Sequence, residues 1–95
     1  MEKRELARMK RRVKALQKEL GELGPVMRGS VVVIGTRNKQ PYLSLNKNKR
    51  TQLIYLGKKR EDRARQYSAN YKRLREIVEA MTQLNMTLLK ENYHI

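Results

Sequence analysis

The stretch VVVIGTRNKQPYLSLNKNKRTQLIYL, residues 31–56, decides the fold of this 95-residue chain. It holds three short runs rich in β-branched and aromatic residues, Val31–Ile34, Tyr42–Leu45 and Leu53–Leu56. Such runs are typical of strands. Between them lie two polar loops whose Gly, Asn and Pro residues tolerate turn conformations. The pattern predicts a three-stranded antiparallel meander over residues 29–57.

Before the meander, apolar residues recur at alternating spacings of three and four, the pattern of a helix with one apolar stripe. Gly24 and Pro25 follow and favour a helix end, because Gly supplies a left-handed cap and Pro disfavours helix in the residue before it. We therefore predict a basic amphipathic helix over residues 1–24. Its helix-pairing seam consists of Leu6, Met9, Val13, Leu16, Leu20 and Leu23.

After the meander, residues 58–92 contain no Gly or Pro and are rich in helix formers, which predicts one long helix. Its own series of alternating spacings predicts a second seam. A lone Asn in such a seam commonly fixes register and partner number. The predicted seam consists of Tyr67, Tyr71, Leu74, Val78, Met81, Asn85 and Leu88.

Together these elements predict an α+β fold of class helix, β-meander, long helix, with the two helices pairing through their seams. A chain of this length is expected to form a single domain, residues 1–95. The helices are expected to pair either antiparallel within one chain or in a four-helix homodimer.

The charge balance is strongly basic, with 23 Lys and Arg against nine Asp and Glu, a formal net charge of +14. Residues 25–57 carry six basic and no acidic side chains, and residues 58–75 carry eight against two. Such charge repels itself unless an anionic partner neutralises it, and phosphate polymers are the usual partner. We therefore expect nucleic acid as the partner, duplex DNA before RNA.

Cations around the predicted sheet and at the start of the last helix are the candidate phosphate ligands. Lys58, Lys59 and Arg60 open that helix, where the helix dipole disfavours cations, and such violations tend to mark functional sites. On the central strand Tyr42, Ser44 and Asn46 alternate with leucines and are expected to face outward toward bases. The predicted nucleic-acid-binding set is Arg28, Arg37, Lys39, Tyr42, Ser44, Asn46, Lys47, Lys49, Arg50, Gln52, Lys58, Lys59, Arg60 and Arg63.

The sequence has few residues that are suited to catalysis or to metal binding. It has no Cys, one Asp and a single His, His94, so we expect no enzyme, no metal site and no cofactor. The absence of Cys and of a long apolar run predicts a cytoplasmic protein, nucleoid-associated if it binds DNA, with no contact to a membrane.

Four runs carry a resemblance: Met27-Arg-Gly-Ser30, Gln40-Pro-Tyr-Leu-Ser44, Tyr71-Lys-Arg-Leu-Arg-Glu-Ile-Val78 and Leu84-Asn-Met-Thr-Leu-Leu89. They resemble a family of uncharacterised small basic proteins of bacteria, archaea and mobile elements, over residues 25–90. Its members carry a cysteine cluster between the first two strands and a His-Gly before the Pro-Tyr, which implies a metal site there. Residues 35–40 here hold neither Cys nor His, so the resemblance implies the architecture and no metal.

A looser resemblance, in topology alone, is to the three-strands-then-helix DNA-binding domains of tyrosine recombinase amino termini and plant transcription factors, whose sheet reads the major groove. We therefore expect a non-enzymatic nucleic-acid-binding accessory protein of a mobile element that grips duplex DNA by its basic sheet and the start of its last helix. One alternative is an RNA-binding ribonucleoprotein subunit in which Tyr42 or Tyr55 stacks on an unpaired base. The other is a helical adaptor that docks on a partner protein. Besides nucleic acid, the expected partners are a second copy of the chain or a larger nucleoprotein complex.

Overall fold

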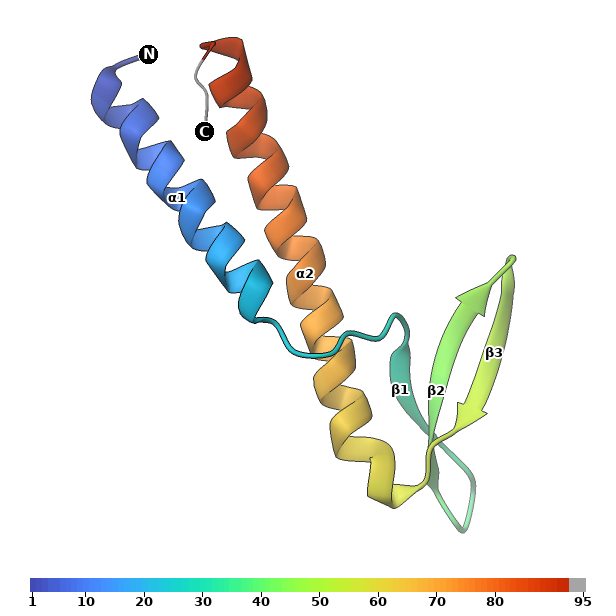
Figure 1. Cartoon of the computed structure of the whole chain (residues 1–95). Coiled ribbons are helices and arrows are strands. Elements are labelled where there is room, and N and C mark those ends of the chain that lie inside the picture. The colour runs from blue at the N-terminus through green and yellow to red at the C-terminus, as the bar shows by residue number, and fades with distance from the viewer. Residues whose placement is uncertain (93–95) are drawn as a thin grey trace. The chain divides into compact units, whose positions relative to one another are not determined.

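The computed structural model describes residues 1–92 and has the predicted order of elements (Figure 1). Helix α1 spans Lys3–Glu22, strands β1, β2 and β3 span Ser30–Ile34, Gln40–Lys47 and Arg50–Tyr55, and helix α2 spans Lys58–Lys90. The predicted fold class is confirmed. The predicted helices extended two residues beyond the observed ones at both ends of α1 and at the C-terminal end of α2, and α2 begins at the predicted residue.

The chain divides into two compact units. One, the sheet unit, is Gly24–Lys72 and contains the three strands and the first half of α2. The other, the helical unit, combines the chain up to Leu23 with the chain from Arg73 onward, and so contains α1 and the second half of α2. Each unit is described by itself below.

In the sheet unit the strands form one antiparallel sheet in the order β1-β2-β3. Strands β2 and β3 are joined by the two residues Asn48 and Lys49, whose φ angles of 53° and 63° are both in the left-handed region. That geometry is a type I′ hairpin turn, whose twist matches that of paired strands. The turn fixes the register, with Lys47 opposite Arg50 and Tyr42 opposite Tyr55.

The β1–β2 loop depends on Gly35, whose φ is 138°. A Cβ at this position would lie 2.5 Å from the carbonyl oxygen of Asn38, closer than any side chain tolerates. The loop therefore requires glycine here, as the sequence pattern indicated.

Hydrogen bonds fasten the segment before β1 to the first half of α2. The Met27 N–H donates to the Tyr67 carbonyl at 3.1 Å, and the Ser68 hydroxyl donates to the Gly29 carbonyl at 2.6 Å. Pro41 and Leu43 of β2 and Ala64 of α2 are the buried residues of this unit. Strand β3, in contrast, is exposed at every position.

In the helical unit α1 runs antiparallel to the second half of α2 (Figure 1). Glu19 bonds to Arg73 at one end of the pair, and the amino group of Met1 lies 3.8 Å from Glu91 at the other. The two helices thus pair within one chain. Of the predicted seam, Val13 and Leu16 are buried, and the other four members, including Leu23 just after α1, are partly buried.

The predicted seam of α2 is wrong at Val78, whose side chain is 50% exposed, whereas its neighbour Ile77 is 0% exposed. The packed face follows the series Leu74, Ile77, Met81, Leu84 and Leu88, which also has spacings of three and four and shares three residues with the predicted one. Two overlapping series are present in the sequence, and the alternative one brings the larger Ile77 and the apolar Leu84 inward.

Two further members of the predicted seam need comment. Tyr67 belongs to the sheet unit, where its carbonyl accepts a hydrogen bond from the Met27 N–H, and Tyr71 lies in the same unit. Asn85 is partly buried, and its Oδ1 atom is buried with no hydrogen-bond partner among the described residues. A role of Asn85 in fixing register remains a prediction.

An ion pair that the sequence pattern did not predict joins the helices. The Nε and Nη2 atoms of Arg73 donate to the Glu19 carboxylate at 2.5 and 2.7 Å. These hydrogen bonds hold the pKa of Glu19 below its ordinary value and raise the pKa of Arg73. Both side chains are about two-fifths exposed, so solvent screens the pair and its contribution to stability is small.

The ion pair makes stability depend on pH in a defined direction. Glu19 stabilises the fold above the pKa of a glutamate in the unfolded chain, about 4.3, and this contribution is lost as the pH falls through the lower pKa of the folded protein. We expect Glu19→Gln to be slightly less stable than the natural chain at pH 7 and equally stable once the pH lies below the lowered pKa of Glu19. Urea unfolding across this range measures the difference. Glu22→Gln, at an exposed position of the same helix, is the control, and an equal effect in both variants would contradict the assignment.

Candidate nucleic-acid interface

Positive charge is concentrated in the sheet unit. Its sequence holds twelve Lys and Arg against two acidic residues, a formal net charge of +10. Among the described residues only one of these cations, Arg65, has a carboxylate partner, Glu61 at 2.8 Å. The other eleven are thus available to an external anion.

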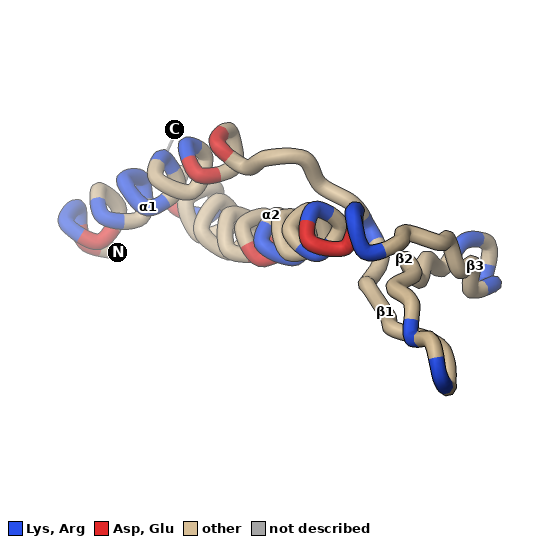
Figure 2. The backbone as a smooth tube through the Cα atoms, turned by 90° about the horizontal axis from the view of Figure 1, so that it is seen from below, with Lys and Arg blue, Asp and Glu red and all other residues tan. Residues whose placement is uncertain are grey.

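The predicted loop cations lie in two clusters at opposite ends of the central strand, visible as separate blue segments in Figure 2. Arg37 and Lys39 lie in the β1–β2 loop, and we name these two residues the loop cluster. Lys47, Lys49 and Arg50 lie at the β2–β3 turn, and we name these three residues the turn cluster. Strand β2 is eight residues long, so the clusters are separated by about 23 Å, given a rise of about 3.3 Å per residue.

The side chain of Arg28, which precedes β1 in sequence, lies at the end of the sheet that carries the β2–β3 turn. Its Nη1 atom donates to the carbonyl oxygen of Asn46 at 2.6 Å. The sequence predicted Arg28 as a phosphate ligand but gave no indication of this position. Arg28 therefore adds a cation near the turn cluster.

Lys49 occupies a backbone conformation that disfavours it. The second residue of a type I′ turn is usually glycine, because a side chain in the left-handed region costs about 1–2 kcal/mol. Asn48 tolerates the left-handed region. Within the described residues, Lys49 makes no local hydrogen bond that would offset the cost of this conformation. Residues held in such strained positions cluster at functional sites, which supports a role for the Lys49 ammonium.

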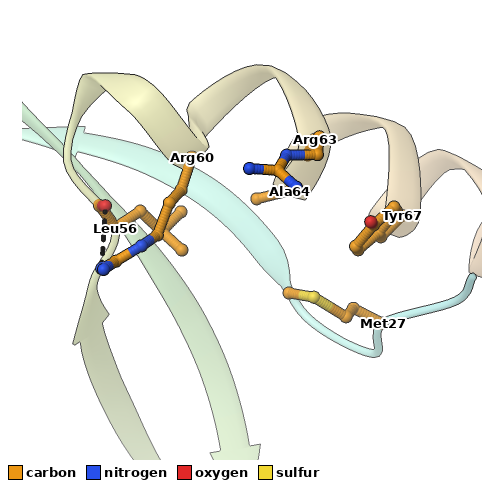
Figure 3. A pocket seen from close by; sticks show the side chains of 6 residues that line it. All are labelled: Met27, Leu56, Arg60, Arg63, Ala64 and Tyr67. Carbon is orange, nitrogen blue, oxygen red and sulfur yellow. Dashed lines mark hydrogen bonds between the residues drawn. The ribbon is translucent and has the colours of Figure 1, made fainter.

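Helix α2 begins at Lys58 as predicted, directly after Gly57, whose φ is 76°. The Nη1 atom of Arg60 bonds back to the Leu56 carbonyl at 3.4 Å (Figure 3). Beside it lies a pocket of about 310 Å³ with an apolar floor and two guanidinium groups on its wall. The pocket is lined by Met27, Leu56, Arg60, Arg63, Ala64 and Tyr67.

The register places the predicted base-facing residues of β2 on one face of the sheet. Tyr42, Ser44 and Asn46 alternate along the strand and share this face with their partners opposite. We name it the tyrosine face. Its members are Ser30, Val32 and Ile34 of β1, Gln40, Tyr42, Ser44 and Asn46 of β2, and Thr51, Leu53 and Tyr55 of β3.

The prediction that Gln52 shares this face is wrong. Gln52 lies opposite Leu45, so its side chain belongs to the other face, together with Leu43. Thr51, which was not predicted, takes the place beside Asn46, and its hydroxyl donates to the Asn46 Oδ1 at 2.8 Å.

The part of the chain that the structure describes has neither a candidate metal site nor a helix suited to cross a membrane. No group of His, Cys, Asp or Glu within residues 1–92 is arranged to hold a metal ion. His94 lies outside the described residues. Neither helix, over its described length, is apolar enough to cross a membrane.

Comparison with protein-family models, curated proteins and solved structures gave no match to this chain.

Proposed function

We propose that the chain binds nucleic acid, without catalysing a reaction, through its sheet unit. The observation that carries this proposal is the formal charge of +10 on that unit, with eleven of its twelve cations lacking a carboxylate partner among the described residues. Phosphate contacts supply most of the affinity in nucleic-acid binding and place the protein on the strand. We assign this role to the loop cluster, the turn cluster, Arg28, and the helix-start cations Lys58, Lys59, Arg60 and Arg63.

The arrangement favours a polyanion with bases over an acidic protein or a lipid surface. The cations lie at both ends of a sheet face that carries two tyrosines and several hydrogen-bonding side chains. A lipid headgroup or an acidic protein would use the charge and leave these groups without a role. A nucleic acid would use the cations and the polar and aromatic side chains together, because phosphate contacts position the strand and base contacts add affinity and sequence preference.

The salt dependence of affinity tests this proposal. Labelled oligonucleotides are titrated with the purified protein at several concentrations of salt between 50 and 200 mM, with anionic lipid vesicles as the comparison. If about six phosphates are neutralised, log K falls against log salt with a slope near −5 on duplex DNA and near −4 on a single strand. A flat response, or binding to vesicles alone, would contradict the proposal.

A second candidate function uses the helical unit. The outer side of α2 exposes Val78, Met86 and Leu89, apolar side chains that are 50%, 52% and 66% exposed. An apolar stripe of this kind suits a second copy of the chain or a partner helix. Under this adaptor reading, Leu89→Asp abolishes function, whereas the same change leaves oligonucleotide binding unaltered under our main proposal.

A further inference from the structure

We infer that the tyrosine face binds unpaired bases, so that the natural ligand is single-stranded nucleic acid or an RNA loop. This inference rests on the proposed function and specifies its ligand. It is carried by the composition of the face, the packing of its two rings, and the placement of the cations around it.

The tyrosine face exposes several apolar and aromatic side chains. Ile34 is 42% exposed, Leu53 53% and Tyr55 54%, and Val32 and Tyr42 are partly exposed. Exposed apolar and aromatic side chains gathered on one face mark an interaction surface, because leaving them in water forgoes the gain from burial.

The two rings are held in place before any ligand arrives. The centroids of Tyr42 and Tyr55 lie 5.5 Å apart at an interplanar angle of 71°, an edge-to-face contact. The Tyr55 hydroxyl donates to the Gln40 Oε1 at 3.3 Å, and the Gln40 Nε2 donates to the Asn38 Oδ1 at 3.1 Å. A platform fixed in this way loses little side-chain entropy on binding.

Unpaired bases suit this surface better than the groove of a duplex. Reading base edges in a groove requires free hydrogen-bonding groups, but Asn46 and Thr51 bond to each other on this face. Stacking requires aromatic and apolar side chains beneath a base plane, and a base offers its plane only where the strand is unpaired. On the tyrosine face, Tyr42 and Tyr55 supply such rings, and the apolar Val32 lies opposite Tyr42.

The surrounding charge fits a strand laid along the face. Tyr55 lines a pocket together with Gly57, Lys58, Lys59 and Arg60, which brings the helix-start cations beside the ring. A Cβ at Gly57 would lie 3.3 Å from the Tyr55 hydroxyl oxygen, so glycine allows this close approach. The turn cluster lies at the far end of β2, so a strand that runs along the face away from Tyr55 would meet further cations there.

The test compares Tyr55→Leu and Tyr55→Phe with Ile54→Ala. Tyr55→Leu removes the ring and keeps an apolar side chain, Tyr55→Phe keeps the ring, and Ile54→Ala changes the opposite face of the same strand at a side chain that is 45% exposed. The probes are a pyrimidine 12-mer as DNA and as RNA, the matching DNA duplex, and inorganic polyphosphate. Circular dichroism confirms that each variant is folded.

We expect the natural protein to bind the single strands more tightly than the duplex, and its tyrosine fluorescence to be quenched on binding. Because stacking contributes about 1–3 kcal/mol per base, Tyr55→Leu should weaken single-strand binding roughly 5- to 150-fold and leave polyphosphate binding unchanged. Ile54→Ala should bind like the natural protein, and Tyr55→Phe, which keeps the ring but loses its hydrogen bond to Gln40, should lose much less affinity than Tyr55→Leu. The DNA and RNA arms identify the sugar that the site accepts.

Preference for the duplex, or equal losses in Tyr55→Leu and Ile54→Ala, would overturn the inference while leaving the proposed function intact. Absence of salt-sensitive binding to every probe, polyphosphate included, would reject the proposed function as well.

Discussion

Ile77→Ala is expected to lower the free energy of unfolding by about 2–5 kcal/mol, the usual cost of truncating a buried Ile. Ile77 is fully buried, and the described part of the helical unit has only three other fully buried side chains, Val13, Leu16 and Leu88. So small a core has few alternative contacts to fill the resulting cavity. Urea unfolding followed by circular dichroism at 222 nm measures the loss.

The neighbouring Val78→Ala is the matched control for this experiment. Val78 is half exposed, so its truncation should change the free energy of unfolding by no more than about 0.5 kcal/mol, and the higher helix propensity of Ala offsets part of that. If Val78→Ala costs as much as Ile77→Ala, the face of α2 that packs has been assigned wrongly, or a second copy covers Val78. Repeating the measurement at two protein concentrations separates these explanations, because only a dimer depends on concentration.

The second large effect is expected at the β2–β3 turn. Replacing Lys47 and Arg50 by Ala and Lys49 by Gly removes three cations, and the slope of log K against log salt should become shallower by about 1 per lost contact, near 3 in all. At 100 mM salt this corresponds to a loss of affinity of tenfold or more. Fluorescence anisotropy of a labelled oligonucleotide measures both quantities.

Lys49→Gly alone separates binding from stability. Glycine relieves the left-handed strain at this position, so the variant should be more stable than the natural chain by about 1 kcal/mol while binding nucleic acid less tightly. A surface residue without a role would give the gain in stability and no loss of affinity.

The control for the triple change removes the same charge from α1. Arg4, Arg8 and Arg11 are exposed there, and their replacement by Ala should leave the salt slope nearly unchanged. Equal effects of the two triple variants would mean that total charge, and not the sheet unit, determines binding.

Much of the fold could be predicted from local patterns. The strand runs, the turn residues and the Gly-free final segment predicted the order of elements, and the single apolar series of α1 predicted its packed face. The face of α2 could not be predicted in the same way. It carries two series with the same spacing, offset by one residue at Val78 and Asn85, and only tertiary packing decides between them.

The candidate site shows a similar division. Its cations could be named from sequence because charge needs no geometry, and the meander alone put them at the ends of the strands. The face occupied by Gln52 depended on the length of the turn. A two-residue turn pairs Asn46 with Thr51, and a shift of one residue sends every side chain of a strand to the other face. The contact of Tyr42 with Tyr55 follows from the same register, whereas the Glu19–Arg73 pair joins residues too distant in sequence for any local pattern.

The most direct test of the central claim is a map of backbone amide chemical shifts in the ¹⁵N-labelled full chain as an unlabelled pyrimidine 12-mer is added. Our account predicts salt-sensitive shifts over residues 37–55 and 58–63, with little change over residues 3–22 and 76–90. Shifts confined to α1 and the second half of α2, or no shifts at low salt, would contradict it.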